Sequence, residues 1–263
     1  LTWSDDKWPT CAHGGIIPSY GIGHSEAQWF VRGVPNVKKA FAKVWETNDL
    51  LTSFDGVSLW RPWNIDPSWK TQSGQAWFHI DQHPISKPGK QCIQGLINLL
   101  PTSKEIGGNV VIPKSHNFFK DIPEEYKERV ERLPLDIDHF RFPHDDPKLS
   151  SEPAVMAHME PGDMLLWDSR TIHCSSSGSS LPQGTNDLIR AASLICMMPK
   201  ELSSKEILEK RIHAAENLVS TTNWTNDFRN ADEFPIILEA ENRDQYKWPK
   251  KPNLSDYQKE LIA

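Results

Sequence analysis

The sequence lacks an excess of positive charge and lacks long apolar runs. Its 29 Lys and Arg residues against 35 Asp and Glu residues give a formal net charge of −6. This charge argues against broad nucleic-acid binding, which requires a basic surface stripe, and it disfavours attraction to an anionic membrane surface. No apolar segment approaches the roughly 20 residues that a membrane helix needs. We therefore expect a protein that binds neither nucleic acid nor membrane.

Paired cysteines and several common catalytic motifs are also missing. The four cysteines stand apart, so no C-x-x-C pair indicates a zinc knuckle or a redox couple: Cys11, Cys92, Cys174 and Cys196. We expect them to be reduced, and the chain starts without a charged-then-apolar leader, so we expect a cytoplasmic protein. No G-x-S-x-G, Walker A, complete G-x-G-x-x-G or H-E-x-x-H motif is present, which disfavours the corresponding hydrolase, nucleotide and zinc-protease chemistries.

What the sequence does have, from residue 50 onward, is a series of short apolar and β-branched segments separated by turn signals. These segments are the expected strands, at residues 51–60, 76–81, 92–100, 109–113, 155–158, 164–168, 171–174 and 190–198. Because little helix lies between them, they indicate a mainly β sandwich or barrel rather than a doubly wound sheet. Helices are expected outside this region, at residues 25–32, 37–47 and 205–218. No linker divides the chain, so residues 1–263 are expected to form one domain with a core at about 51–199.

Two segments have the composition of covers over a site. Residues 114–153 form a long, polar, Pro-rich excursion between expected strands, with a charged helix expected at 123–133. Insertions of this length in a compact β domain are often lids or binding loops. Residues 11–24 are rich in Gly and Pro and lack strong periodicity, which also suggests a mobile cover. The serine-rich stretch 175–180 is expected to be a surface loop.

The strongest chemical feature is the pair His79 and Asp81. Side chains alternate along a strand, so an H-x-D spacing places an imidazole and a carboxylate on the same side of a strand end. The motif alone is weak because chance produces it often. A third ligand is available in His173, which follows a strand that begins after a Pro-Gly-Asp turn. Two histidines and one carboxylate that leave open positions on the metal are typical of non-heme Fe(II) oxygenases.

An arginine follows the third candidate ligand. Arg190 comes 17 residues after His173 and opens the last expected core strand. Its planar guanidinium can pair with a carboxylate through two parallel hydrogen bonds. This position therefore suits the binding of a dicarboxylate co-substrate next to a metal.

The order of these motifs resembles the phytanoyl-CoA dioxygenase family over about residues 51–199. The motifs are H-x-D, then Gly107 to His116 (GGNVVIPKSH), then P-G-D, then His173, then Arg190. The resemblance implies a double-stranded β-helix, which is a jelly-roll, cupin-like fold, with flanking α-helices. It also implies Fe(II) as the metal and 2-oxoglutarate and O2 as co-substrates. The chain departs from the family where Lys114 replaces the usual glycine before Ser115, and in a longer gap between His173 and Arg190.

The resemblance assigns roles to individual residues. The implied iron ligands are His79, Asp81 and His173. Arg190 would anchor the C5 carboxylate of 2-oxoglutarate, and Ser175 and Gln94 would be further contacts to this co-substrate. Three residues are weaker candidates for substrate contacts, with structural roles as the default: Trp60, Arg61 and His83.

These features favour an oxygenase that oxidises an unactivated C–H bond of a small organic molecule. Hydroxylation is the default outcome, and desaturation or oxidative cyclisation would use the same ligands. One alternative is a cupin-like metalloenzyme that does not use 2-oxoglutarate, and another is a non-catalytic metal- or ligand-binding module. Arg190 argues against the first, and the complete ligand set argues against the second. The substrate and the oligomeric state stay open.

Overall fold

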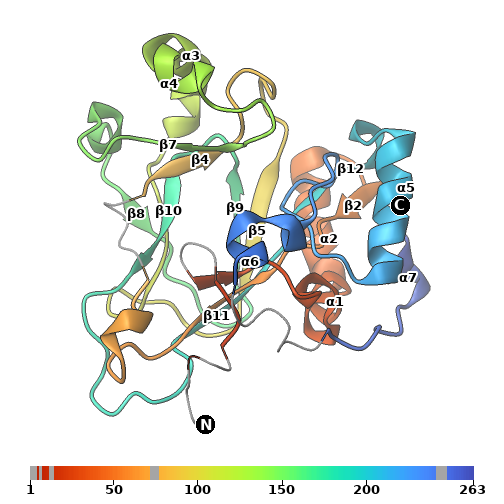
Figure 1. The fold of residues 1–263 in the computed structure, drawn as a ribbon, viewed down its shortest axis with the longest axis horizontal. Helices are drawn as coiled ribbons and strands as arrows, with labels where there is room; N and C mark the ends of the chain where they lie inside the picture. The colour runs from red at the N-terminus through yellow and green to blue at the C-terminus, as the bar shows by residue number, and fades with distance from the viewer. Residues whose placement is uncertain (1–4, 6–7, 12–14, 72–76, 241–247) are drawn as a thin grey trace.

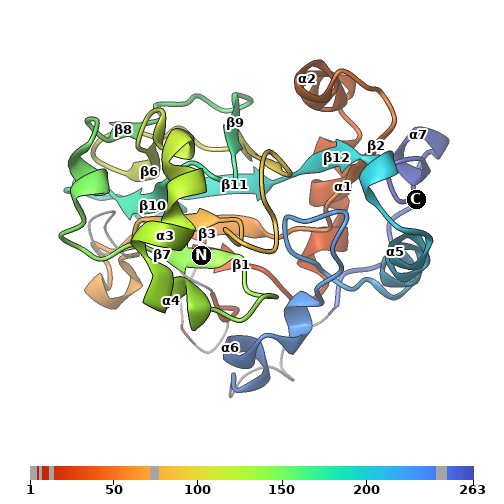
Figure 2. The ribbon, with the colours of Figure 1, turned by 90° about the horizontal axis from the view of Figure 1, so that it is seen from above.

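Two antiparallel five-stranded sheets form the centre of the molecule (Figures 1 and 2). The structure is a computed structural model and describes residues 5, 8–11, 15–71, 77–240 and 248–263. The larger sheet has the order β1 (Ile16–Ile17), β3 (Val57–Trp60), β11 (Arg190–Leu194), β5 (Ile93–Asn98) and β9 (Met164–Asp168). The second sheet has the order β7 (His139–Arg141), β4 (His79–Asp81), β10 (His173–Ser177), β6 (Gly107–Val111) and β8 (Val155–Met156).

Helices pack beside the larger sheet, as the resemblance implied. They are α1 (Glu26–Arg32), α2 (Pro35–Trp45), α5 (Lys205–Asn217), α6 (Pro235–Leu238) and α7 (Asp256–Lys259). The caps explain where two of them begin, because the Ser25 hydroxyl accepts from the Gln28 amide and the Ser204 hydroxyl from the Ile207 amide. On α2, Val37 and Phe41 are buried together with apolar residues of β5. The expected double-stranded β-helix with flanking helices is confirmed.

The insertion at 114–153 packs against the second sheet and is more ordered than its polar composition suggests. It contains α3 (Ile122–Glu125), α4 (Lys127–Glu131) and the strand β7, where the sequence predicted one helix and irregular chain. Phe140 and Phe142 from this insertion are buried with Ile80 and Ile172 of the second sheet. Figure 1 shows α3 and α4 above β7 and β4, apart from α5 and α7 at the right of the view. These shared apolar contacts attach the insertion to the second sheet.

Two expected strands are each broken in the structure. The segment predicted at 51–60 forms β2 (Leu50–Thr52) and β3, and the segment at 190–198 forms β11 and β12 (Met197–Pro199). The two breaks face each other, since the Ser53 amide donates to the Cys196 carbonyl (2.8 Å) and the Cys196 amide donates to the Ser53 hydroxyl (3.0 Å). As a result β2 and β12 pair separately as a two-stranded sheet. The break at 53–56 also places Asp55 at the site described below.

The prediction of a surface loop at 175–180 is wrong for its first residues. Ser175 pairs with Asn109 in the ladder between β10 and β6, which continues to Ser177 opposite Gly107. A Cβ at Gly107 would lie 2.1 Å from the Ser176 carbonyl oxygen, so only glycine permits this close approach. Long-range pairing therefore overrides the low strand preference of a serine run. None of the helices in the described part of the chain has the length and apolar character of a bilayer-spanning segment.

Candidate metal centre

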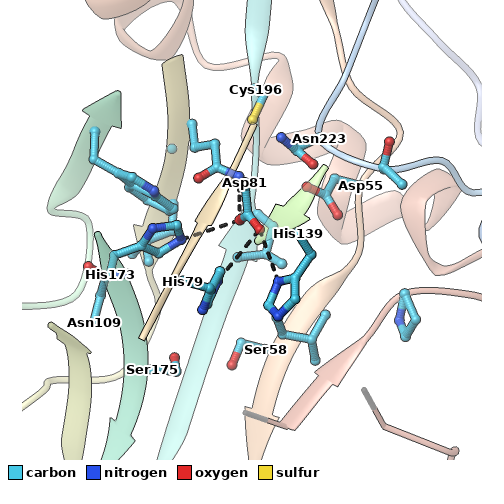
Figure 3. Close-up of a pocket in the computed structure, with 18 of the residues that line it drawn as sticks. Asp55, Ser58, His79, Asp81, Asn109, His139, His173, Ser175, Cys196 and Asn223 are labelled. Atoms are coloured by element: carbon cyan, nitrogen blue, oxygen red, sulfur yellow. Dashed lines mark hydrogen bonds and ion pairs between the residues drawn. The ribbon is translucent and has the colours of Figure 1, made fainter. Parts of the chain in front are cut away.

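The structure brings the three predicted ligands together. His79 begins β4 and Asp81 ends it, while His173 begins the neighbouring strand β10 directly opposite His79. The Nε2 atoms of the two histidines lie 3.5 Å and 3.3 Å from the Asp81 carboxylate oxygens. The potential ligand atoms of the three residues all lie within 4.8 Å of one another. Figure 3 shows the two imidazoles converging on Asp81. All three side chains could therefore bind one metal ion.

Backbone carbonyls orient both imidazoles toward this point. His79 Nδ1 donates to the Trp77 carbonyl (2.9 Å), and His173 Nδ1 donates to the Thr171 carbonyl (2.8 Å). A carbonyl can only accept, so each Nδ1 carries a proton and each Nε2 is directed toward the centre. Burial lowers the pKa of His79 to about 4 even though Asp81 acts to raise it. His79 is therefore neutral at neutral pH, as metal binding requires.

The Asp81 carboxylate has two further polar neighbours. Gln94 on β5 donates from Nε2 to Asp81 Oδ2 (2.9 Å), and His139 Nδ1 lies 3.4 Å from Asp81 Oδ1. Burial acts to raise the pKa of Asp81, but the surrounding histidines hold it well below its usual range. Gln94 was predicted as a co-substrate contact, and the structure adds a contact from its amide to the ligand carboxylate.

Sequence reasoning missed His139. It lies on β7 directly opposite Asp81 in the strand ladder, and its ring centroid is 4.3 Å from that of His79. The available signal was the short alternation from His139 to Phe142, in which Phe140 and Phe142 are buried while His139 faces the other way. Four residues within a polar insertion were too short a pattern to indicate a strand.

We expect the Gln94→Ala substitution to reduce iron affinity or turnover by about 10- to 100-fold, the range seen when a partner that orients a metal ligand is lost. The substitution removes the donor that fixes one Asp81 oxygen. Gln183→Ala, at an exposed position, is the matched control. Iron retention and steady-state turnover are the measurements, and wild-type values for both in Gln94→Ala would show that Asp81 needs no such support.

Arg190 lies at the start of β11 and is buried, with 1% of its surface exposed. Its guanidinium lies 4.7 Å from the ring centroid of Trp60, its cross-strand partner on β3. Burial lowers the pKa of Arg190 to about 10, so the group is still charged at neutral pH. Its buried Nε and Nη1 have no hydrogen-bond partner in the described part of the chain. A buried cation with unused donors is costly, and an incoming carboxylate would satisfy it.

One cavity of about 250 Å³ connects these groups. Both sheets contribute to its wall, and the predicted residues that line it are His79, Asp81, Gln94, His173, Ser175 and Arg190. Asn109 also lines it, with a buried side-chain oxygen that has no partner in the described residues. Two imidazoles and a carboxylate beside an arginine with two unused donors fit iron together with a dicarboxylate.

The weaker substrate candidates lie elsewhere. Arg61 pairs with Asp5 (2.5 Å) and stacks on Trp69 (4.2 Å) beside a separate hollow. His83 is fully buried, and its Nδ1 accepts from the backbone amides of residues 85 and 86. Neither side chain is among the residues that line the cavity, so the structure gives no support to a substrate contact from either. Trp60 lies beneath Arg190, where it supports the guanidinium.

Parts of the cavity wall were not predicted. Asp55 and Cys196 come from the two strand breaks. Asn223 and Phe234 come from the chain after α5, which the sequence indicated only as a flank. Their contribution depends on long-range packing, for which the local sequence carries no signal.

The chain is similar to known proteins of one family. The family described as phytanoyl-CoA dioxygenase (PhyH) matches residues 58–181. Ava biosynthesis cluster protein O of Aspergillus versicolor is 33% identical over 229 residues, which are 84% of this chain and 70% of that protein. The chain belongs to the phytanoyl-CoA dioxygenase family. The crystal structure of GlcNAc Inducible Gene 2 from Candida albicans has a TM-score of 0.50 at 13% identity, covering 95% of this chain and 70% of that one, and shares the fold.

Membership in the phytanoyl-CoA dioxygenase family accounts for the cofactor set. Enzymes of the family use Fe(II), 2-oxoglutarate and O2, as the sequence led us to expect. The ligand triad fits Fe(II), and the unused donors of Arg190 fit 2-oxoglutarate. The protein therefore falls in the non-heme iron and 2-oxoglutarate class.

Proposed function

We propose that the protein is an Fe(II)- and 2-oxoglutarate-dependent oxygenase that oxidises an unactivated C–H bond of a small organic substrate, with hydroxylation as the default outcome. One observation carries the proposal. The unused, buried donors of Arg190 line the same cavity as the His79, Asp81 and His173 triad. A metalloenzyme without a dicarboxylate co-substrate would have no need for a buried, unpaired cation beside its metal.

Each residue has a defined task in this proposal. The triad would hold the iron, Arg190 would bind the distal carboxylate of 2-oxoglutarate, and Ser175 and Gln94 would contact the co-substrate. Iron with 2-oxoglutarate supplies the oxidising power, drawn from O2, that an unactivated C–H bond requires. The Trp77 and Thr171 carbonyls hold the two imidazoles with Nε2 toward the metal position. Gln94 fixes Asp81, and the cavity wall excludes water.

The same residues limit the reaction outcome. Asp81 is present within the triad and half-buried, so no ligand position is free for a halide, and this argues against halogenation. Desaturation and oxidative cyclisation need the same ligands as hydroxylation, and the placement of the substrate C–H bond decides among them. The relative from Aspergillus versicolor is named for a biosynthesis cluster, which supports a small organic molecule as substrate.

The test is a screen for substrate-stimulated succinate release. Purified protein with Fe(II), 2-oxoglutarate and O2 would be incubated with a metabolite library, and succinate would be measured. We expect release that requires all three and rises with the correct compound. Turnover of a compound without 2-oxoglutarate would instead indicate a cupin-like metalloenzyme. An iron titration that detects no binding would indicate a binding module whose metal site is vestigial.

Both segments predicted as covers contribute to the cavity wall. Ile16 and Pro18 come from the N-terminal segment and His139 from the insertion, whereas residues 12–14 lie outside the described residues. We expect hydrogen exchange to slow in at least one of these segments when a substrate found by the screen joins the complex with iron and 2-oxoglutarate. If this substrate changes the hydrogen-exchange rate in neither segment, substrate specificity would have to come from the strands instead.

A further inference from the structure

A carboxylate that has no charged partner among the described residues lies in the cavity beside the metal centre. Asp55 follows β2, in the break that separates β2 from β3, and lines the cavity. In the view of Figure 3 it lies across Asp81 from His173. Asp55 makes no ion pair within 4.0 Å in the part of the chain that the structure describes. One of its oxygens, Oδ1, accepts from the Gly56 amide (2.7 Å), which leaves Oδ2 as the free acceptor.

Arg32, whose positive charge acts on Asp55, makes its hydrogen bonds to backbone carbonyls. Arg32 on α1 donates to the backbone carbonyl of Asp55 (3.1 Å) and to that of Gly23, and not to the Asp55 carboxylate. Gln28 donates to the same Asp55 carbonyl (3.0 Å). These bonds fix the backbone at Asp55, so the position of the carboxylate is held while its charge stays without a partner.

Asp55 has a cost in stability. Burial raises the pKa of its carboxyl to about 6, against the opposing effects of Gly56 and Arg32, and Asp81 raises it further. Cys196 is the other titratable group beside it. Because the folded protein holds this proton more tightly than the unfolded chain does, the stability contributed by Asp55 falls as pH rises from about 4 to 6. At neutral pH the ionised carboxylate therefore destabilises the fold, and such groups concentrate at functional sites.

The charges of the loaded site leave Asp55 unbalanced. This step rests on the proposed function. Iron, Asp81, doubly charged 2-oxoglutarate and Arg190 together carry no net charge. The negative charge of Asp55 is additional, and a cationic substrate would neutralise it. Asn223 lines the same part of the cavity, and its Nδ2 donates to Cys92 Sγ (3.6 Å). Its side-chain oxygen lies on the side of Asp55 (Figure 3), so two acceptors lie near one another.

We propose that Asp55, with Asn223 beside it, recognises a protonated amine on the substrate. The substrate is then a small organic cation whose ammonium group pairs with Asp55 while another part of the molecule lies at the metal centre. An ammonium suits a site with one free carboxylate oxygen better than a planar guanidinium does, because a guanidinium pairs best with two oxygens at once.

The binding test uses amines and matched neutral alcohols. Primary alkyl and arylalkyl amines, which are protonated at neutral pH, and the alcohols that replace each amine by a hydroxyl would be titrated calorimetrically into the anaerobic protein loaded with Fe(II) and 2-oxoglutarate. We expect amines to bind at least 10-fold tighter than their alcohols, and Asp55→Asn to weaken the tightest amine by at least about 30-fold. Asp49→Asn, an exposed carboxylate in the loop before β2, is the matched control. A library with no amine preference, or a preference that survives in Asp55→Asn, would overturn the proposal.

Two further measurements distinguish this proposal from a failure of the proposed function and from a purely structural role of Asp55. The Kd for 2-oxoglutarate should be unchanged in Asp55→Asn. If the wild-type protein itself does not bind 2-oxoglutarate, the proposed function is refuted, and not the amine site alone. A structural role for Asp55 would be seen in stability. Asparagine can still accept from the Gly56 amide but carries no charge, so we expect Asp55→Asn to melt at a higher temperature than wild type at pH 8. A lower melting temperature would show that Asp55 supports the fold and would contradict its assignment as a binding group.

Discussion

Removing any one ligand of the triad should abolish turnover while the fold persists. We expect His79→Ala, Asp81→Ala and His173→Ala each to reduce succinate release by more than about 100-fold, beyond the loss typical of residues that only orient a metal ligand. Two remaining protein ligands hold iron too weakly and leave it poorly placed. The side chains face the cavity, so their loss leaves the apolar packing of Ile80, Ile172 and Cys174 intact.

Iron content and stability would distinguish loss of metal from loss of fold. The melting temperature of the wild type should rise when Fe(II) is added, because a ligand that binds only the folded state stabilises it. The three variants should show little or no such rise. His144→Ala, at an exposed position in the insertion, is the control and should behave as wild type. Full activity of purified Asp81→Ala with added Fe(II) would refute the ligand assignment.

Loss of Arg190 should act on 2-oxoglutarate. Truncating one partner of a desolvated charge pair costs about 2–5 kcal/mol, so we expect Arg190→Ala to raise the Kd of 2-oxoglutarate by about 30- to several-thousand-fold. Arg190→Lys should remain impaired because an ammonium cannot reproduce the planar fork. The guanidinium is buried over Trp60 and has unused donors, so it is placed to receive a carboxylate.

The measurement is calorimetric titration of 2-oxoglutarate into anaerobic, Fe(II)-loaded protein. Arg132→Ala removes an exposed arginine and serves as the control. Iron retention should be unchanged in Arg190→Ala and Arg190→Lys because Arg190 is not among the three candidate metal ligands. A wild-type Kd in Arg190→Ala would mean that a different basic residue binds the co-substrate.

The candidate ligands and Arg190 could be predicted because their signals are either a short local spacing or the order of motifs along the chain. Strand alternation puts the two side chains of the H-x-D motif on the same side of a strand. The order of motifs shared with the family then identified His173 and Arg190. In the structure, a strand pairing sets His173 opposite His79. The same local reasoning placed the three large flanking helices.

The misplaced and missed residues depend on contacts between distant segments. Arg61 follows an expected strand, but its position is set by Trp8 and Trp69 and by Asp5, which no local pattern relates to it. His139 reaches the site only because β7 pairs with β4. Asp55 faces the cavity because two expected strands break at the same place, and that coincidence is a property of the packed fold.

The most direct test of the central claim is the binding of 2-oxoglutarate with and without Fe(II). If the triad holds iron and Arg190 binds the distal carboxylate, the two groups hold one molecule between them. Calorimetry under anaerobic conditions should then show tight 2-oxoglutarate binding to the Fe(II)-loaded wild type, much weaker binding to the metal-free protein, and weak binding to His173→Ala with or without iron. Affinity for 2-oxoglutarate that is absent, or that is the same with and without Fe(II), would contradict the account.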